Sequence, residues 1–378
     1  MNVLFVDDNV LVLSGLRRAL YPHRAAFTSH FASTVADALE TLAEGDFNVI
    51  VSDMRMPDMD GAELLRQVAE LYPATLRIIL SGQTGEDAAL RAVAVAHQFL
   101  SKPCPIETLV EAIQRGAAQR EVENVGGLAA LVGRVGALPV APSLFVTLGE
   151  VMADPNADAS AVAAVLQRSP LVVAKLLQLV NSSFFSAPQR IIGLEAAIAR
   201  LGLRIVRAVV ITEGVFESGG AGVYSVEQQK RFLDEASTAM AAVQAMAAAG
   251  PARDTALTAA LLAHIGVPLL ASVAPELAIR VRDAVAAGAQ LADCEQAITG
   301  TTHAAFAAHI LSLWNLPTDV VDAVAHHHDL PTSWDPAAMV HFAWALAEHR
   351  PVDLDLARAI GAPPPGIAML QELRDARG

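Results

Sequence analysis

Cysteine is scarce in this chain, which has only two such residues, Cys104 and Cys294, among 378. Their number and wide separation exclude a disulfide framework. No basic-then-apolar leader opens the sequence, since Asp7 and Asp8 come too early for a signal peptide. These features predict a protein of the reducing cytoplasm, in which both thiols serve as small apolar side chains.

Basic residues are also few, with 26 Lys and Arg against 40 Asp and Glu and a formal net charge of −14. Such a charge repels phosphate backbones, and no basic arm or helix offsets it, so we expect no nucleic-acid partner. Charged residues make up only 17% of the chain and hydrophobic residues 53%. This composition excludes disorder as the main state.

Steady hydrophobic runs of membrane-spanning length are missing as well. The longest uncharged run, Thr255 to Pro275, is interrupted by His264, Gly266 and Pro268. A bilayer span favours uninterrupted Leu, Ile, Val and Phe. We therefore expect a buried core helix with its turn here, and no membrane partner.

The first 118 residues alternate short apolar runs with helical stretches. Such runs are typical of parallel strands that are covered on both faces. We predict an α/β domain over residues 1–118, a doubly wound sheet of five strands with five helices. The expected strands are Val3–Val6, Phe47–Val51, Arg77–Leu80 and Gln98–Leu100, with a weaker one near Ala26–Phe31.

The residue pattern of the sequence changes after two glycines near residue 127. Long Ala, Leu and Val segments with helical spacing follow, and prolines separate them. We predict a linker over 119–127, an all-α domain over 128–350 and a C-terminal extension over 351–378. The tail from Ile360, with three consecutive prolines, is expected to be loosely held.

Acidic residues follow two of the predicted strands directly. Asp7 and Asp8 come after the first strand, and Asp53 after the strand at 47–51. Because the carboxyl ends of parallel strands line one crevice, the three carboxylates should converge there. Clustered carboxylates attract a cation, and a set of oxygen ligands suits Mg²⁺. Ser81 and Lys102 follow two further strands, and they should point into the same crevice, where lysine and metal can stabilise a phosphoryl group.

Four motifs in order carry a family resemblance: VDDN at 6–9, DMRMPDMDG at 53–61, ILSG at 79–82 and FLSKP at 99–103. Residues 1–118 thereby resemble the receiver domain of two-component response regulators, which has a flavodoxin-like fold. The resemblance implies that Asp53 is the phospho-acceptor and that Ser81 and Lys102 contact the phosphoryl oxygens. It further implies a magnesium site made by Asp7, Asp8, Asp53 and the backbone carbonyl of Arg55. Phe99 would be the switch aromatic, and the phosphoryl donor would be a sensor histidine kinase.

Histidines concentrate in the second half of the chain. The segment 137–185, AIARLG at 197–202, ALLAHIG at 260–266 and the segment 302–329 with its HHHD ending resemble an HDOD domain. HDOD domains are similar to HD-type phosphohydrolases, whose His-Asp dipeptide binds catalytic metals. Ala263-His264 stands at that place here, so the bridging Asp is missing and we expect no enzyme and no cofactor in this half. His264 is expected to be a hydrogen-bonded core residue, and His264, His303, His327 and His328 could form a vestigial metal or ligand site.

These features together predict a cytoplasmic response regulator whose HDOD half acts through protein–protein contacts. Family association suggests a cyclic-di-nucleotide signalling enzyme as the output partner, and a homodimer is possible. Two alternatives stay open: a regulated HD-type phosphohydrolase with an altered metal site, and a phosphate-independent scaffold.

Overall fold

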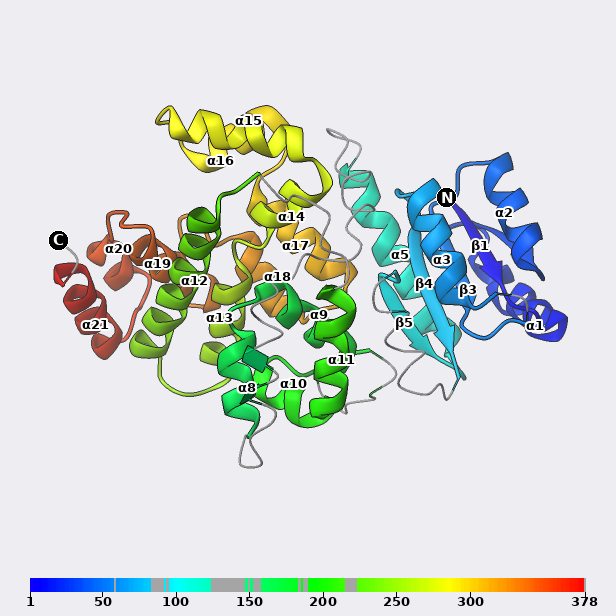
Figure 1. Ribbon diagram of the computed structural model, residues 1–378, viewed down its shortest axis with the longest axis horizontal. Coiled ribbons are helices and arrows are strands. Elements are labelled where there is room, and N and C mark those ends of the chain that lie inside the picture. The colour runs from blue at the N-terminus through cyan, green and yellow to red at the C-terminus, as the bar shows by residue number, and fades with distance from the viewer. Residues whose placement is uncertain are drawn as a thin grey trace. The chain divides into compact units, whose positions relative to one another are not determined.

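A computed structural model describes residues 1–57, 59–82, 92, 95–123, 147–148, 150–151, 158–182, 185, 190–214 and 223–376. The chain divides into two compact units, the first built around residues 1–137 and the second holding most of the remainder. The first unit contains the sheet, and the second is helical (Figure 1).

All five strands of the sheet are parallel, in the order β2-β1-β3-β4-β5. Their bounds are β1 Asn2–Val6, β2 Thr28–Ala32, β3 Val49–Asp53, β4 Leu76–Ser81 and β5 Gln98–Ser101. Each lies within two residues of its predicted position, the weak candidate near Ala26–Phe31 included. The predicted doubly wound α/β fold is confirmed.

Burial along the strands explains why their sequences are continuous apolar runs. Every residue of β3 and β4 is buried, as are the last four of β1. Side chains alternate between the two faces of a sheet, so unbroken burial means that both faces are covered. The edge strand β2 is more exposed, and its sequence, TSHFA, is correspondingly more polar.

Three helices of the first unit begin at polar caps. Asn9, Thr34 and Asp60 each accept a backbone N–H at the start of α1 Val10–Leu20, α2 Val35–Glu44 and α3 Gly61–Leu71. The described part of this unit also contains the short η1 Tyr21–His23 and α5 Ile106–Glu123. Helix α5 continues through Glu123, so the first residues of the predicted linker are helical, while 124–127 lie outside the described residues. The expected fifth helix falls on residues 83–94, most of which are also outside them.

The second unit contains only helices among the described residues, as predicted. Prolines and polar caps begin many of them, including Pro251 of α13, Pro275 of α15 and Asp335 before α19. The helices are α8 Ala159–Leu166, α9 Pro170–Val180, α10 Leu194–Leu201, α11 Leu203–Gly214, α12 Val226–Met246, α13 Pro251–Leu262, α14 Gly266–Val273, α15 Pro275–Ala286, α16 Leu291–Thr299, α17 His303–Leu313, α18 Thr318–Ala325, α19 Pro336–Ala347, α20 Leu354–Ala359 and α21 Pro364–Asp375.

The core of this unit forms where α12, α13, α18 and α19 pack together. Helix α19 is buried from Ala338 to Ala347, apart from the half-buried His341. The long uncharged segment identified in the sequence becomes α13, a turn at His264, and α14. A window of the span Pro251–Val273 has the length and hydropathy of a membrane helix, but 83% of it is buried inside the protein. It is therefore the predicted core helix with its turn.

The C-terminal tail is ordered, and this corrects the expectation that it is loosely held. Pro363 occupies the N-cap position of α21, and Pro364 and Pro365 occupy its first two positions. The backbone N–H that proline lacks has no partner within the helix at these positions. Leu370 is fully buried, and α21 packs on α12. The three prolines thus start a helix that closes one side of the core.

Candidate functional site

The first candidate site lies at the carboxyl ends of β1, β3 and β4. Asp7 follows β1, Asp53 ends β3, and both are buried. Lys102 follows β5 and reaches across to both carboxylates. Its Nζ lies 2.6 Å from Asp7 Oδ2 and 2.5 Å from Asp53 Oδ1. The structure thus brings Asp7, Asp53 and Lys102 together, as the sequence predicted.

The remaining oxygens of the two carboxylates accept backbone hydrogen bonds. The N–H of Asn9 donates to Asp7 Oδ1, and the N–H of Arg55 donates to Asp53 Oδ2, each at 2.9 Å. These bonds fix the orientation of both side chains. Burial lowers the pKa of Lys102, but its hydrogen bonds and charge interactions with Asp53 and Asp7 outweigh this and raise it above the ordinary value. The lysine is therefore a permanent cation between two acids.

The other predicted residues lie around this trio. Ser81 is buried at the end of β4 and directly follows Leu80, the residue paired with Asp53 of β3. On its other side Ser81 pairs with Ser101 of β5, which precedes Lys102. Asp8 is exposed at the end of β1. Phe99 is buried on β5 opposite Ile79. The Arg55 backbone touches Asp53 through its N–H, and the role of its carbonyl stays a prediction.

Two buried acids, an exposed third acid and one lysine leave a surplus of negative charge. Such a donor set of oxygens suits a hard divalent cation. The residues present therefore fit Mg²⁺, with Asp7, Asp8 and Asp53 as the carboxylate ligands.

A glycine keeps Asp53 in place. A Cβ at Gly61, the first residue of α3, would lie 2.0 Å from the backbone oxygen of Asp53, closer than any real contact. Gly61→Ala therefore has to displace β3 or α3. We expect it to lower the unfolding free energy by about 1–3 kcal/mol or more.

The matched control for Gly61 is Gly15, inside α1, where an added Cβ meets nothing within 4 Å. Gly15→Ala is expected to stabilise by about 0.5–1 kcal/mol, since alanine favours a helix over glycine. Urea unfolding of both variants measures the difference. Equal effects at the two positions would refute the role of Gly61.

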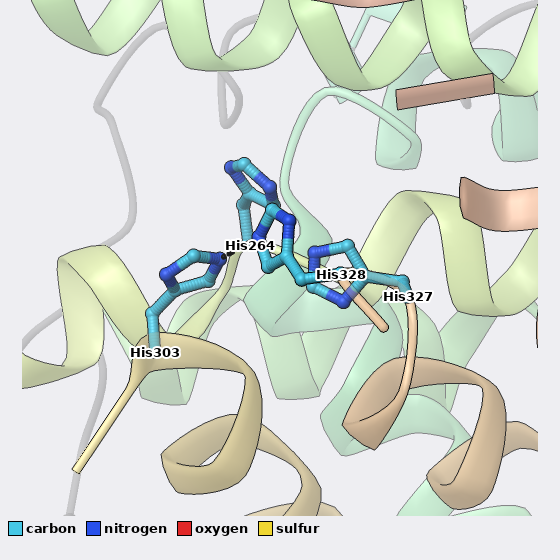
Figure 2. A group of neighbouring side chains, drawn as sticks. All are labelled: His264, His303, His327 and His328. Atoms are coloured by element: carbon cyan, nitrogen blue, oxygen red, sulfur yellow. Dashed lines mark hydrogen bonds between the residues drawn. The ribbon is translucent and has the colours of Figure 1, made fainter. Parts of the chain in front are cut away.

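The second candidate site is a cluster of four histidines in the helical unit. His264 lies in the turn between α13 and α14, His303 begins α17, and His327 and His328 follow α18. Figure 2 shows the four rings turned toward one another. One ring nitrogen from each lies within 4.8 Å of the other three. Three separate segments of the chain thus contribute to one small volume.

Neighbouring groups fix the tautomers of two of these rings. Glu295 Oε2 lies 2.7 Å from His303 Nδ1 and also accepts the His303 backbone N–H. The carbonyl of Val324 lies 2.7 Å from His327 Nδ1. Because a carbonyl or carboxylate oxygen only accepts, both Nδ1 atoms carry the hydrogen. In a neutral ring held this way, Nε2 presents a lone pair.

Three of the four imidazoles, those of His264, His327 and His328, are held in the neutral form. Burial, followed by the charges of neighbouring histidines, lowers the pKa of His264 and His327 well below the ordinary value. Burial likewise lowers the pKa of His328 to about 3, with His303 adding to the effect. Neutral rings with free lone pairs are the metal-binding form of histidine.

The expectation that His264 is a hydrogen-bonded core residue is only half correct. It is buried and its ring stacks on Trp344, with centroids 3.6 Å apart and an interplanar angle of 9°. Its Nε2, however, has no hydrogen-bond partner among the described residues, and Glu348 approaches it only to 3.6 Å. Sequence reasoning also missed Glu295, whose only sequence signal is a carboxylate eight residues before His303.

The parallel sheet with two acids, a serine and a lysine at its carboxyl edge has the arrangement of a receiver domain, and a receiver joined to a further domain is the arrangement of a response regulator. Comparison with family models agrees: residues 3–114 match the response regulator receiver domain and residues 138–330 match the HDOD domain. The chain belongs to the HDOD family and carries an N-terminal receiver domain.

Curated relatives match through a limited part of their length. The chain is 34% identical over 131 residues to the hydrogenase transcriptional regulatory protein HoxA of Bradyrhizobium diazoefficiens, covering 33% of this chain and 26% of that one. It is 31% identical over 154 residues to the DNA-binding transcriptional regulator NtrC of Escherichia coli K12, covering 39% and 32%. The chain thus spans only a quarter to a third of these relatives.

A solved structure resembles more of the chain. The MmoQ response regulator of Methylococcus capsulatus Bath covers 62% of this chain and 97% of its own, with a TM-score of 0.51 and 21% identity. At this identity the likeness supports the fold alone.

Proposed function

We propose that this response regulator works in a two-component phosphorelay, accepting a phosphoryl group on Asp53 from a sensor histidine kinase. The observation that carries the proposal is Lys102, whose Nζ bridges Asp7 and Asp53 at 2.6 and 2.5 Å. A lysine held between two buried carboxylates at the sheet edge is placed to meet a third negative group bound to one of them.

The covalent step is a displacement at phosphorus. A carboxylate oxygen of Asp53 forms the new O–P bond while the P–N bond of the phosphohistidine breaks, and the electron pair leaves with the donor's imidazole. Lys102 neutralises the phosphoryl oxygens, and the Ser81 hydroxyl donates a hydrogen bond to one of them. When bound by Asp7, Asp8, Asp53 and the Arg55 carbonyl, Mg²⁺ supplies further positive charge to the phosphoryl oxygens.

Phosphorylation changes the charge at the end of β3. The carboxylate carries one negative charge and the acyl phosphate close to two, so Ser81 and Lys102 are drawn toward it. Ser81 ends β4, and Phe99 lies on the adjacent β5. Inward movement of the Ser81 backbone opens space for the Phe99 ring to reorient, and this carries the signal to the surface of the receiver.

The output of the helical half is proposed to be protein–protein contact rather than catalysis. Support comes from Ala263-His264, where HD-type hydrolases have a His-Asp dipeptide. A cyclic-di-nucleotide signalling enzyme is the partner that family association suggests, with the cytoplasm as the compartment and a homodimer as an option for assembly.

Intact-mass measurement tests the phosphorylation step. The purified full chain, incubated with Mg²⁺ and acetyl phosphate, is expected to gain a single phosphoryl adduct. Reduction with borohydride and peptide mapping should place it at residue 53. A correctly folded chain that gains no adduct, or gains it elsewhere, would overturn the proposal.

A further inference from the structure

The four-histidine cluster contains two buried ring nitrogens that make no hydrogen bond to any residue the structure describes. The Nε2 atoms of His264 and His327 are both buried and lack a hydrogen-bond partner among the described residues. The Nε2 atoms of His303 and His328 lie 3.0 Å apart, so one of them must be protonated to avoid opposing lone pairs. Leaving polar nitrogens unpaired in a core costs free energy unless a ligand takes up the lone pairs.

We propose that His264, His303, His327 and His328 bind one divalent transition-metal ion of the zinc class, each through a single ring nitrogen. Imidazole nitrogen is a preferred ligand of Zn²⁺, Fe²⁺, Ni²⁺ and Cu²⁺, whereas Mg²⁺ and Ca²⁺ prefer oxygen. The cluster offers nitrogen alone, which separates it chemically from the oxygen-lined receiver site.

The spacing of the nitrogens suits a single ion. At a metal–nitrogen distance of about 2.0–2.1 Å, the ligands of a tetrahedral site lie about 3.3 Å apart. The nitrogens in the cluster are at most 4.8 Å apart, and the His303–His328 pair is already at 3.0 Å. Modest inward rotation of the rings closes the shell, and Trp344 limits how the His264 ring can move by stacking on it.

Carboxylates around the cluster supply the outer contacts that such a site needs. Glu295 is 1% exposed and holds His303 Nδ1, an arrangement that orients a ligating imidazole and raises its basicity. Glu348 lies 3.6 Å from His264 Nε2, and its other oxygen pairs with Arg350 at 2.6 Å. Two carboxylates near the four rings, set against one arginine, offset part of the charge of a buried divalent ion.

A glycine brings two of the ligands together. A Cβ at Gly266 would lie 2.1 Å from the backbone oxygen of His303, so only glycine lets the α13–α14 turn approach the start of α17 this closely. The bound ion would link that turn, α17 and the segment after α18. With four protein ligands the shell has no open position for water, which makes it a structural site rather than a hydrolytic one.

Metal analysis of the full chain, purified without a histidine tag, tests this directly. We expect about one transition-metal ion per chain. After chelation and reloading with Co²⁺, we expect the strong visible absorption of a four-coordinate ion. His327→Gln should abolish both signals. The matched control is His326→Gln, because His326 is the neighbouring residue but is exposed and pairs with Asp329.

A second variant keeps the proposal falsifiable if ligand substitution impairs folding. Glu295→Gln preserves the volume and all four ligands, and we expect it to weaken Co²⁺ binding about 10–100-fold. Metal content equal in the parent and His327→Gln, or unchanged Co²⁺ affinity in Glu295→Gln, would overturn the site. So would metal that is lost on Asp53→Asn instead, since it would then belong to the receiver. The inference does not depend on the proposed phosphorelay, because phosphoryl uptake is measured separately.

Discussion

Asp53→Asn is expected to abolish phosphoryl uptake from acetyl phosphate altogether. The amide keeps the shape of the side chain but is neutral and a poor nucleophile, so the O–P bond of an acyl phosphate cannot form. The substitution also removes one of the two carboxylates that hold Lys102. Intact mass after incubation with Mg²⁺ and the donor should show only the unmodified chain.

Asp46→Asn is the matched control for this experiment. It makes the same chemical change at an exposed residue just before β3, away from the carboxyl ends of the strands. Uptake in this variant should equal that of the parent. An adduct formed to the parental level in Asp53→Asn, with the control behaving normally, would show that another residue is the acceptor.

The receiver site could be predicted because its residues occupy fixed places in a regular fold. Parallel strands bring their carboxyl ends to one edge, so Asp7, Asp53 and Lys102 had to converge once the strands were assigned. Their contacts at 2.5–2.6 Å confirm that step. The hydrogen bonds from the N–H groups of Asn9 and Arg55 were not foreseen, since they depend on loop conformation.

The four histidines of the cluster could be named as candidates from the sequence, but their meeting in one site could not be predicted from it. Its members come from a turn, a helix start and a segment after α18, and helix packing alone decides whether these meet. Nothing in the spacing of Glu295 and His303 revealed their contact, because the chain turns between α16 and α17. The expectation of a loosely held tail was wrong for a different reason: three consecutive prolines do not exclude a helix, because at the first positions of α21 proline begins one.

Trp344→Ala is expected to destabilise the helical domain by about 3–5 kcal/mol, as removal of a large buried aromatic generally does. Trp344 is fully buried in α19, its ring stacks on His264, and its indole N–H donates to the Ala260 carbonyl at 3.0 Å. Alanine leaves a cavity between α13 and α19 and removes the support of the His264 ring. Trp344→Phe should cost less, since it retains a stacking ring and loses chiefly the hydrogen bond.

Tryptophan fluorescence during guanidinium unfolding measures the loss of unfolding free energy in the helical domain. The three tryptophans are at positions 314, 334 and 344, and the receiver domain at residues 3–114 contains none. Trp334→Ala is the matched control because Trp334 is only half-buried, and it should cost clearly less. Equal losses at the two positions would mean that the contact with His264 and α13 adds little. A graded order, with Trp344→Ala worst and Trp344→Phe milder, would show that the ring and its hydrogen bond to Ala260 both stabilise the packing of α19 on α13.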